Sequence, residues 1–346
     1  MSKEKEKKEK EEGSPQVKRL RDLLKRLQKE VSKEISYEIG SIDRIKLDSV
    51  DINNALGGGL PRGLITEIGG DYSSGKTTLS FEFINAFLRE DPNNAAMFID
   101  AEHALSRDYM EALIGENMDR VLIIQPLTIE EVFKSIIIAT ESGVGLVVVD
   151  SVAAMMSSQE YGHGVDNKVI GTGARSISQG MKHILGPLRK TNTSLILLNQ
   201  LRNKVGVMFG NPLQTTGGKA IEFYSSVRAM LTGYRSKSGQ EENSSGEVVS
   251  NQSILRVEKN KTAPPFRETE KFSIEYGKGI DFVQSNVELA IKEGLIEQGG
   301  AWYSVPLRNG EIERLQGRDN VYRFFKDKKN LQEYLYLKKG LEQNLY

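Results

Sequence analysis

Short runs of apolar residues recur through the middle of the chain, and an amphipathic stretch separates each run from the next. The five runs are residues 64–70 (LITEIGG), 95–102 (AAMFIDAE), 120–126 (RVLIIQP), 145–151 (GLVVVDS) and 194–200 (SLILLNQ). Continuous apolar strands that alternate with helices are typical of a parallel sheet covered on both faces. The pattern therefore predicts an α/β fold with a central, mostly parallel sheet flanked by helices. Ligands bind such sheets beyond the carboxyl ends of the strands.

The N-terminal region has a different pattern. Residues 1–14 alternate Lys and Glu with almost nothing apolar, so we expect a disordered segment or a frayed, solvated helix. Apolar residues then recur three and four positions apart, at Val17, Leu20, Leu23, Leu24, Leu27, Val31 and Ile35. This spacing predicts a helix of about 20 residues with one apolar stripe, over 16–36. The pattern leaves open whether this helix packs on its own core or docks on a neighbouring subunit.

The tail beyond about residue 277 has its own apolar periodicity and contains the single tryptophan, Trp302. Its last residues, 327–346, form a charged, Tyr-containing stretch that we expect to be helical. The chain is accordingly predicted to have three parts. They are a charged tail and N-terminal helix over 1–40, a core over 41–276, and a small α+β C-terminal domain over 277–346.

Composition and charge narrow the function classes. The 346 residues include 47 Lys and Arg and 47 Asp and Glu, so the net charge is zero and any nucleic-acid site must be a local patch. The absence of cysteine excludes disulfides and thiolate zinc sites, and the three histidines show no metal-ligand spacing. No apolar run approaches the roughly 20 residues that span a bilayer. The first residues lack the apolar segment of a signal peptide, so we expect a cytoplasmic protein.

The first apolar run leads into a motif for nucleotide phosphates. Residues 70–77, GDYSSGKT, fit the pattern G-x-x-x-x-G-K-[ST]. Glycines let successive N–H groups face phosphate oxygens, and the following helix directs its positive end to the same point. Lys76 would reach the terminal phosphates of ATP, and the Thr77 hydroxyl would bind Mg²⁺. A glycine-rich turn with a surface lysine is disfavoured, because the motif follows a strand and opens a helix. The predicted nucleotide-binding residues here are Gly70, Ser73, Ser74, Gly75, Lys76, Thr77 and Thr78.

Carboxylates follow two further strands. Asp150 ends the fourth run, where a carboxylate would hold Mg²⁺ through water. Without the lysine motif we would interpret Asp150 as a cap of the following helix, and the motif favours the metal role. Glu102 follows the second run, and a glutamate there suits the orientation or deprotonation of the water that attacks the γ-phosphate. Asp100 is a rival for that role, since a period of two places both residues on one face of a strand. The pattern does not separate them.

Residues 199–218, NQLRNKVGVMFGNPLQTTGG, combine two cations and no acids with a Val-Met-Phe run. Gly and Pro at this density argue against a helix or a regular strand, so residues 201–218 are predicted to form a loop. Loops usually run over the surface, where such an apolar run is unusual. The pattern alone does not say what these side chains contact.

Taken together, seven strings resemble the bacterial RecA recombinases, and the resemblance runs nearly without gaps from about Ser49 to Trp302. The strings are GDYSSGKTT, FIDAEHAL, VVVDSVAA, LLNQLRNKVGVMFGNP, TTGGKAIEFYSSVR, EKNKTAPPF and LIEQGGAWYS. The resemblance implies a RecA-type P-loop ATPase core that uses ATP and Mg²⁺. It also favours the docking interpretation of the N-terminal helix, because the family packs that helix on the next protomer.

The resemblance implies roles around the nucleotide. Lys76 and Thr77 match the phosphate and Mg²⁺ ligands, and Asp150 matches the second metal carboxylate. Glu102 matches the base that activates water. Tyr109 falls where the family stacks an aromatic ring on adenine.

The resemblance also implies that nucleotide and assembly are coupled. Gln200 matches the residue that senses the γ-phosphate and passes the signal into the following loop. Lys259 and Lys261, which would otherwise read as a solvated charge run, match two lysines that reach the ATP of the adjacent subunit. The active site would then be complete only in a filament. Phe223 matches an aromatic residue at the subunit interface.

Two segments resemble the DNA-binding loops of the family. The loop at 201–218 matches the second of them, with phosphate contacts and with apolar side chains that wedge into the base stack, so binding should be largely independent of sequence. Its candidate DNA-binding residues are Arg202, Lys204, Val205, Met208, Phe209, Gly217 and Gly218. The segment 158–178 and the helix after it match the first loop, with the apolar wedge Ile170 and the polar residues Arg175, Ser178 and Lys182.

Several positions depart from the family pattern. Asp71-Tyr72 stand in the phosphate loop where typical members have Pro-Glu, and Ser106 replaces an Asp near the adenine. Glu222 replaces a lysine at the subunit interface, which reverses a charge, and Leu213 replaces an acid in the second loop. These changes indicate a divergent member.

The function that follows is ATP-dependent strand exchange in homologous recombination and DNA repair. A helical filament of this chain would hold single-stranded DNA and pair it with a homologous duplex. One alternative is a RecA-fold DNA motor such as a helicase, which has no reason to carry both DNA loops and the EKNK string. Another is an ATP-switched filament scaffold that promotes cleavage of a repressor protein, as in an SOS response.

Overall fold

The computed structural model describes residues 15–32, 41–163, 171–203, 213–234, 240–242 and 247–345. The chain divides into two compact units, residues 1–42 and 43–346. In the first unit, α2 (Pro15–Glu30) confirms the N-terminal amphipathic helix over most of its predicted length. Its apolar side chains Leu20, Leu23 and Leu27 are exposed. The last residue of the predicted stripe, Ile35, lies outside the described residues, and so do residues 1–14.

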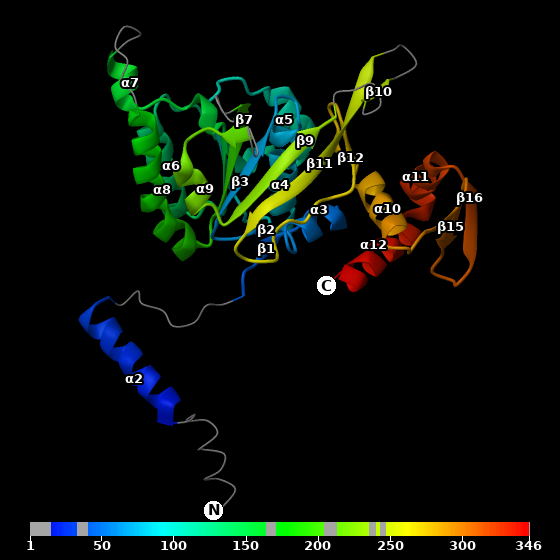
Figure 1. Ribbon diagram of the computed structural model, residues 1–346, viewed down its shortest axis with the longest axis horizontal. Helices are drawn as coiled ribbons and strands as arrows, with labels where there is room; N and C mark the ends of the chain where they lie inside the picture. Colours follow the sequence, from blue (N-terminus) through cyan, green and yellow to red (C-terminus); the bar gives the residue numbers. More distant parts are fainter. Residues whose placement is uncertain are drawn as a thin grey trace, which may run out of the picture. The chain divides into compact units, whose positions relative to one another are not determined.

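A large, mostly parallel sheet forms the centre of the second unit, as predicted (Figure 1). The five predicted strands are β3 (Ile65–Gly70), β4 (Ala96–Asp100), β5 (Val121–Ile124), β6 (Leu146–Asp150) and β7 (Ser194–Asn203). Four more strands extend it: β9 (Val227–Gly233), β11 (Val248–Asn260), β12 (Phe272–Glu275) and β13 (Gly279–Ile280). The order is β13-β12-β11-β9-β3-β7-β6-β4-β5. Strands from β9 to β5 pair in parallel, and those from β9 to β13 pair antiparallel.

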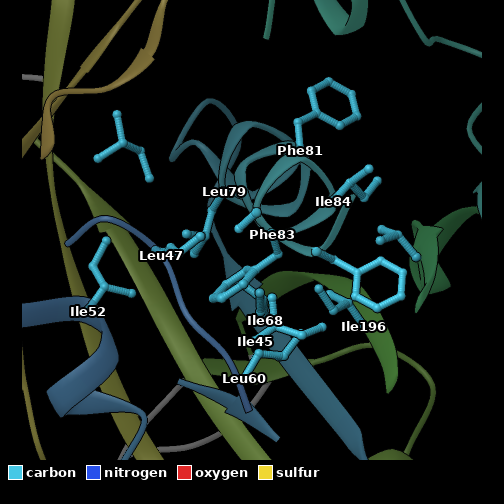
Figure 2. Close-up of a cluster of buried hydrophobic side chains, with 14 of the residues drawn as sticks. Ile45, Leu47, Ile52, Leu60, Ile68, Leu79, Phe81, Phe83, Ile84 and Ile196 are labelled. Atoms are coloured by element: carbon cyan, nitrogen blue, oxygen red, sulfur yellow. The ribbon is translucent and has the colours of Figure 1, made fainter. Parts of the chain in front are cut away.

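Helices cover both faces of this sheet because successive strand residues point to opposite sides. On one face, α4 (Lys76–Glu90) and α5 (Arg107–Ile114) pack on a cluster that includes Phe83, Ile68 and Ile196 (Figure 2). On the other face, α6 (Ile129–Glu141) and α8 (Thr172–Thr191) pack on a cluster that includes Val147 and Leu195. The apolar runs are therefore buried on both sides, which explains why they do not alternate with polar residues.

Two segments that we predicted as loops are partly regular. β7 continues to Asn203 and pairs antiparallel with β8 (Leu213–Thr215), so residues 201–203 and 213–215 form a ribbon. The loop prediction was wrong there, because cross-strand hydrogen bonds supplied by the return segment satisfy the backbone. In the segment 158–178, α7 (Ser158–His163) and the first turns of α8 are helical. Residues 164–170 and 204–212 lie outside the described residues.

The C-terminal part of the second unit has its own apolar core. It contains α10 (Phe282–Lys292), α11 (Arg318–Lys326), α12 (Leu331–Leu345) and the antiparallel strands β14 (Glu297–Gly299), β15 (Trp302–Pro306) and β16 (Ile312–Gln316). Leu289, Val305 and Leu341 are buried in its core, and Val50 of α3 (Val50–Ala55) joins them. This arrangement fits the predicted small α+β region.

The remaining α-helix and strands of the described residues are short. They are β1 (Arg44–Ile45) and β2 (Leu60–Pro61), which pair with each other, α9 (Lys219–Tyr224), and β10 (Gln240–Glu242), which pairs with β11. No helix in the described ranges is both long and apolar enough to cross a membrane.

Candidate nucleotide and DNA site

The phosphate-binding motif forms the turn between β3 and α4. Ser73 and Gly75 adopt left-handed backbone conformations, with φ of 57° and 95°. Such alternation turns successive N–H groups toward one concave side. The φ of Gly75 would strain any other residue, and a Cβ there would also lie 2.1 Å from Ile274 Cδ1. Lys76 Nζ donates hydrogen bonds to the carbonyl oxygens of Gly70 at 3.1 Å and Asp71 at 2.7 Å, so the lysine folds over the loop.

Thr77 and Asp150 meet beside this loop. Thr77 Oγ1 donates a hydrogen bond to Asp150 Oδ2 at 2.7 Å. The pKa of Asp150 is raised to about 6. Burial is the largest cause, the hydrogen bond from Thr77 opposes it, and the charge of Glu102 adds to it. The described residues contain no group of three or more His, Cys, Asp or Glu arranged to hold a metal. One hydroxyl and one carboxylate still suit Mg²⁺, which keeps several waters and binds substrate phosphates.

The structure distinguishes Asp100 from its rival Glu102. The Asp100 side chain is buried, and its carboxylate accepts hydrogen bonds from the N–H groups of Ala104 at 3.3 Å and Leu105 at 3.2 Å. It also accepts one from Gln125 Nε2 at 2.8 Å. Asp100 therefore holds the turn that follows β4, and its oxygens are occupied.

Glu102 is exposed and faces the end of β7. Its Oε1 accepts a hydrogen bond from Gln200 Nε2 at 3.0 Å and another from Ser151 Oγ. The β4 strand ends at Asp100, so strand periodicity does not govern Glu102. Its accessibility makes Glu102 the better candidate for a base, and the bond from Gln200 joins it to the strand that enters the candidate DNA loop.

A cavity of about 260 Å³ lies next to these groups. Its lining includes Thr77, Glu102, Ser106, Tyr109 and Asp150. The Tyr109 hydroxyl lies 2.6 Å from Thr78 Oγ1, and burial raises the pKa of the Tyr109 phenol. Ser106 caps the N-terminus of α5 by accepting a hydrogen bond from the Tyr109 N–H at 3.3 Å. The cavity thus brings the predicted adenine-stacking residue beside the predicted metal ligands.

Lys259 and Lys261 do not line this cavity. They lie at the C-terminal end of α9, where Lys259 Nζ donates to the carbonyl oxygens of Glu222 at 2.5 Å and Phe223 at 3.1 Å. Lys261 Nζ donates to the Phe223 carbonyl oxygen at 3.3 Å and lies 5.8 Å from the centre of the Phe223 ring. Burial lowers the pKa of Lys259, and the neighbouring charge of Lys261 lowers it further. The Phe223 ring is exposed.

The candidate DNA residues fall partly inside the described ranges. Arg175, Ser178 and Lys182 lie on α8, with Arg175 and Lys182 exposed. Gly217 and Gly218 have φ of 87° and 74°, and Gly218 is the residue before α9. The backbone of Arg202 pairs with Gln214 in the ribbon. The side chain of Arg202, together with Ile170, Lys204, Val205, Met208 and Phe209, lies outside the described residues.

Our sequence reasoning missed a buried polar network beneath the site. Glu67 of β3 is fully buried, and its carboxylate accepts hydrogen bonds from Arg228 Nε at 2.5 Å and Asn199 Nδ2 at 2.9 Å. Asn199 Nδ2 also donates to the Thr216 carbonyl oxygen at 2.8 Å, and Arg228 lies 3.5 Å from Glu222. The sequence did contain one indication of this network. Glu67 is a charged residue within an apolar run, and both faces of a strand in such a run are expected to be buried.

Comparison with known proteins agrees with this arrangement. A family model described as the RecA N-terminal domain matches residues 18–281. The chain is 43% identical to protein RecA of Colwellia psychrerythraea over 286 residues, which cover 82% of this chain and 79% of that protein. It is 38% identical to protein RecA of Thermus aquaticus over 323 residues, which cover 91% of this chain and 92% of that one. The described geometry and these matches lead to one conclusion: the chain belongs to the RecA family.

Proposed function

We propose that this protein is an ATP-dependent recombinase that assembles on single-stranded DNA and exchanges strands with a homologous duplex. The observation that carries the proposal is the hydrogen bond of 3.0 Å between Gln200 and Glu102. Gln200 belongs to β7, which continues directly into the candidate DNA loop. One side chain therefore connects the candidate catalytic carboxylate with the segment that would contact DNA.

At the nucleotide, the N–H groups of residues 73–76 and the Lys76 ammonium would bind the phosphates of ATP. Thr77 and Asp150 would hold Mg²⁺, which offsets the negative charge of the phosphate oxygens. Glu102 would orient the attacking water and accept its proton, giving ADP and phosphate. Hydrolysis would serve to release DNA rather than to drive pairing.

Assembly would bring a second copy to the site. Lys259 and Lys261 hold their ammonium groups at the surface beside the exposed Phe223 ring, a position suited to a phosphate group of a neighbouring subunit. A separate apolar groove of about 430 Å³ between α6 and α8 is lined by Phe133, Ile137, Ile138 and His183, among others. We assign α2 of a second copy as its occupant, because that helix exposes a matching stripe of leucines.

The test compares ATP hydrolysis with and without single-stranded DNA. Wild type should be stimulated severalfold. Glu102→Gln keeps the size and the hydrogen-bonding oxygen but cannot accept a proton, so hydrolysis should fall by roughly 10²-fold or more while ATP binding persists. Strand exchange between a single strand and a homologous duplex is measured in parallel.

Lys261→Ala should lose the stimulation by DNA, because the neighbouring phosphate loses its cation. The exposed Lys278→Ala is the matched control, since Lys278 pairs with Glu275 at 2.9 Å in a turn away from α9. Hydrolysis that ignores DNA in wild type would contradict the recombinase proposal. Such a result would favour a motor or an ATP-switched scaffold.

A further inference from the structure

A strand of the central sheet, β11, forms a hydrogen bond with the backbone of the phosphate-binding loop. Ser253 lies in β11 and is fully buried. Its Oγ donates a hydrogen bond of 3.1 Å to the carbonyl oxygen of Ser74, in the middle of the loop. The loop residue and the strand residue are 179 positions apart in the sequence, so only the fold brings them together.

This bond fixes more than the carbonyl group. The Ser74 carbonyl and the Gly75 N–H belong to one planar, trans peptide unit, so they point in opposite directions. A donor that holds the carbonyl oxygen toward β11 therefore holds the Gly75 N–H away from β11. Phosphate-binding loops present successive N–H groups of this kind to the phosphate oxygens.

The surroundings make this contact specific. A Cβ at Gly233 of β9 would lie 3.1 Å from Ser74 Cα, and Ile274 of β12 fills the space below Gly75. The Ser74 hydroxyl is buried and has no hydrogen-bond partner among the described residues. The side chain of Ser74 therefore does not anchor the loop, whereas its backbone carbonyl is anchored by Ser253.

We propose that Ser253 is a positioning residue for nucleotide binding, whose hydroxyl sets the Ser74–Gly75 peptide plane so that the Gly75 N–H faces the phosphates. The inference rests on the proposed function, because it takes ATP as the ligand of the loop. Ser253 lies on β11, outside the phosphate-binding motif of residues 70–77, so the motif does not indicate its role.

The experiment measures the dissociation constant of Mg-ATP by equilibrium dialysis without DNA, together with steady-state hydrolysis. Ser253→Ala frees the peptide plane and should weaken ATP binding by about threefold to tenfold, the value of one neutral hydrogen bond. KM should rise by a similar factor while kcat stays within about twofold, since the lost interaction acts equally on bound substrate and transition state. Ser253→Thr keeps the hydroxyl and should restore binding.

Ser273→Ala is the matched control. Ser273 is a buried serine on the adjacent strand β12, and its hydroxyl has no hydrogen-bond partner among the described residues. Its removal should leave ATP binding unchanged. If Ser253→Ala melts far below wild type, Ser253→Cys replaces it in the experiment. A thiol is close in size to a hydroxyl but is a weak donor, so ATP binding should again weaken.

The inference alone would be overturned by ATP binding of Ser253→Ala equal to wild type, or by an equal loss of ATP binding in Ser273→Ala. Ser253→Thr that melts like wild type but binds as weakly as Ser253→Ala would also overturn it. Wild type that fails to bind ATP would overturn the proposed function together with this inference.

Discussion

Two buried carboxyl groups outside the nucleotide site carry raised pKa values. Glu82 of α4 is buried, and its Oε1 accepts a hydrogen bond of 3.1 Å from the Ile280 N–H. Burial raises its pKa from 4.5 to about 7, the bond from Ile280 opposes this, and Arg89 and Asp48 contribute smaller effects of opposite sign. Burial likewise raises the pKa of Asp51 to about 7. Both residues join the core to the segment that leads into the C-terminal region.

The Glu82→Gln variant should change the dependence of stability on pH. Because the pKa of Glu82 is higher in the folded state, its protonated carboxyl group favours folding. This contribution to the free energy of unfolding is fully present below about pH 4.5 and is lost as pH rises to about 7. At pH 8 the ionised carboxylate is destabilising by about 3 kcal/mol. Glutamine keeps the acceptor oxygen, so the variant should melt above wild type at pH 8 but not at pH 4.5.

Thermal melting followed by circular dichroism at both pH values checks this expectation. Glu111→Gln is the control, since Glu111 lies on the surface of α5 in an exposed pair with Arg107. It should melt like wild type at both pH values. A Glu82→Gln variant that melts below wild type at pH 8 would contradict the stated cause.

At the scale of elements, the last helix holds the C-terminal region together. α12 buries Leu337 and Leu341 in a core with α10, α11 and the small sheet, whereas its Leu335 is 46% exposed. The Tyr334 hydroxyl accepts a hydrogen bond of 2.8 Å from Asn286 Nδ2 of α10. One face of α12 thus carries nearly all of its packing.

Leu341→Ala should therefore destabilise the C-terminal region by about 2–5 kcal/mol, through lost burial and the cavity left behind. Leu335→Ala, on the exposed face, should cost under about 1 kcal/mol. Urea unfolding followed by the fluorescence of Trp302, the single tryptophan and a residue of β15, reports on this region. Equal midpoints for the two variants would show that α12 does not pack as described.

At the scale of the whole molecule, the proposed filament requires contacts between copies. The formal net charge is zero, so net charge repulsion between copies does not oppose assembly, and local surfaces decide it. The groove between α6 and α8 is the surface proposed above, and Ile138, one of its lining residues, is 53% exposed.

Ile138→Asp should abolish or strongly reduce assembly on single-stranded DNA with ATP, because a carboxylate would be desolvated against the leucines of α2. Light scattering and sedimentation measure the size of the assemblies. Ile312→Asp is the control: Ile312 is also exposed, but it lies on β16 of the C-terminal sheet. Normal assembly of Ile138→Asp would rule out this groove as the docking site.

The sequence by itself determined the layers of the fold and the centre of the site. Apolar runs of strand length indicate a parallel sheet because both faces of each strand must be buried. The residues from Gly70 to Thr77 and the strand-end Asp150 were recognisable because adjacent residues or a strand end suffice to specify them. This local information explains why the five strands and the flanking helices were predicted, and why Thr77 and Asp150 were each predicted as a Mg²⁺ ligand.

Tertiary structure alone decided which distant residues meet. The strand pattern does not separate Asp100 from Glu102, and only the resemblance favoured Glu102. The structure gives the physical reason, because the turn after β4 occupies the oxygens of Asp100 and leaves Glu102 to Gln200. Ser253 resembles any other strand serine until β11 lies beneath the phosphate loop. Such contacts depend on strand order and on register, and a linear pattern of apolar and polar residues encodes neither one, because it records only which positions are buried.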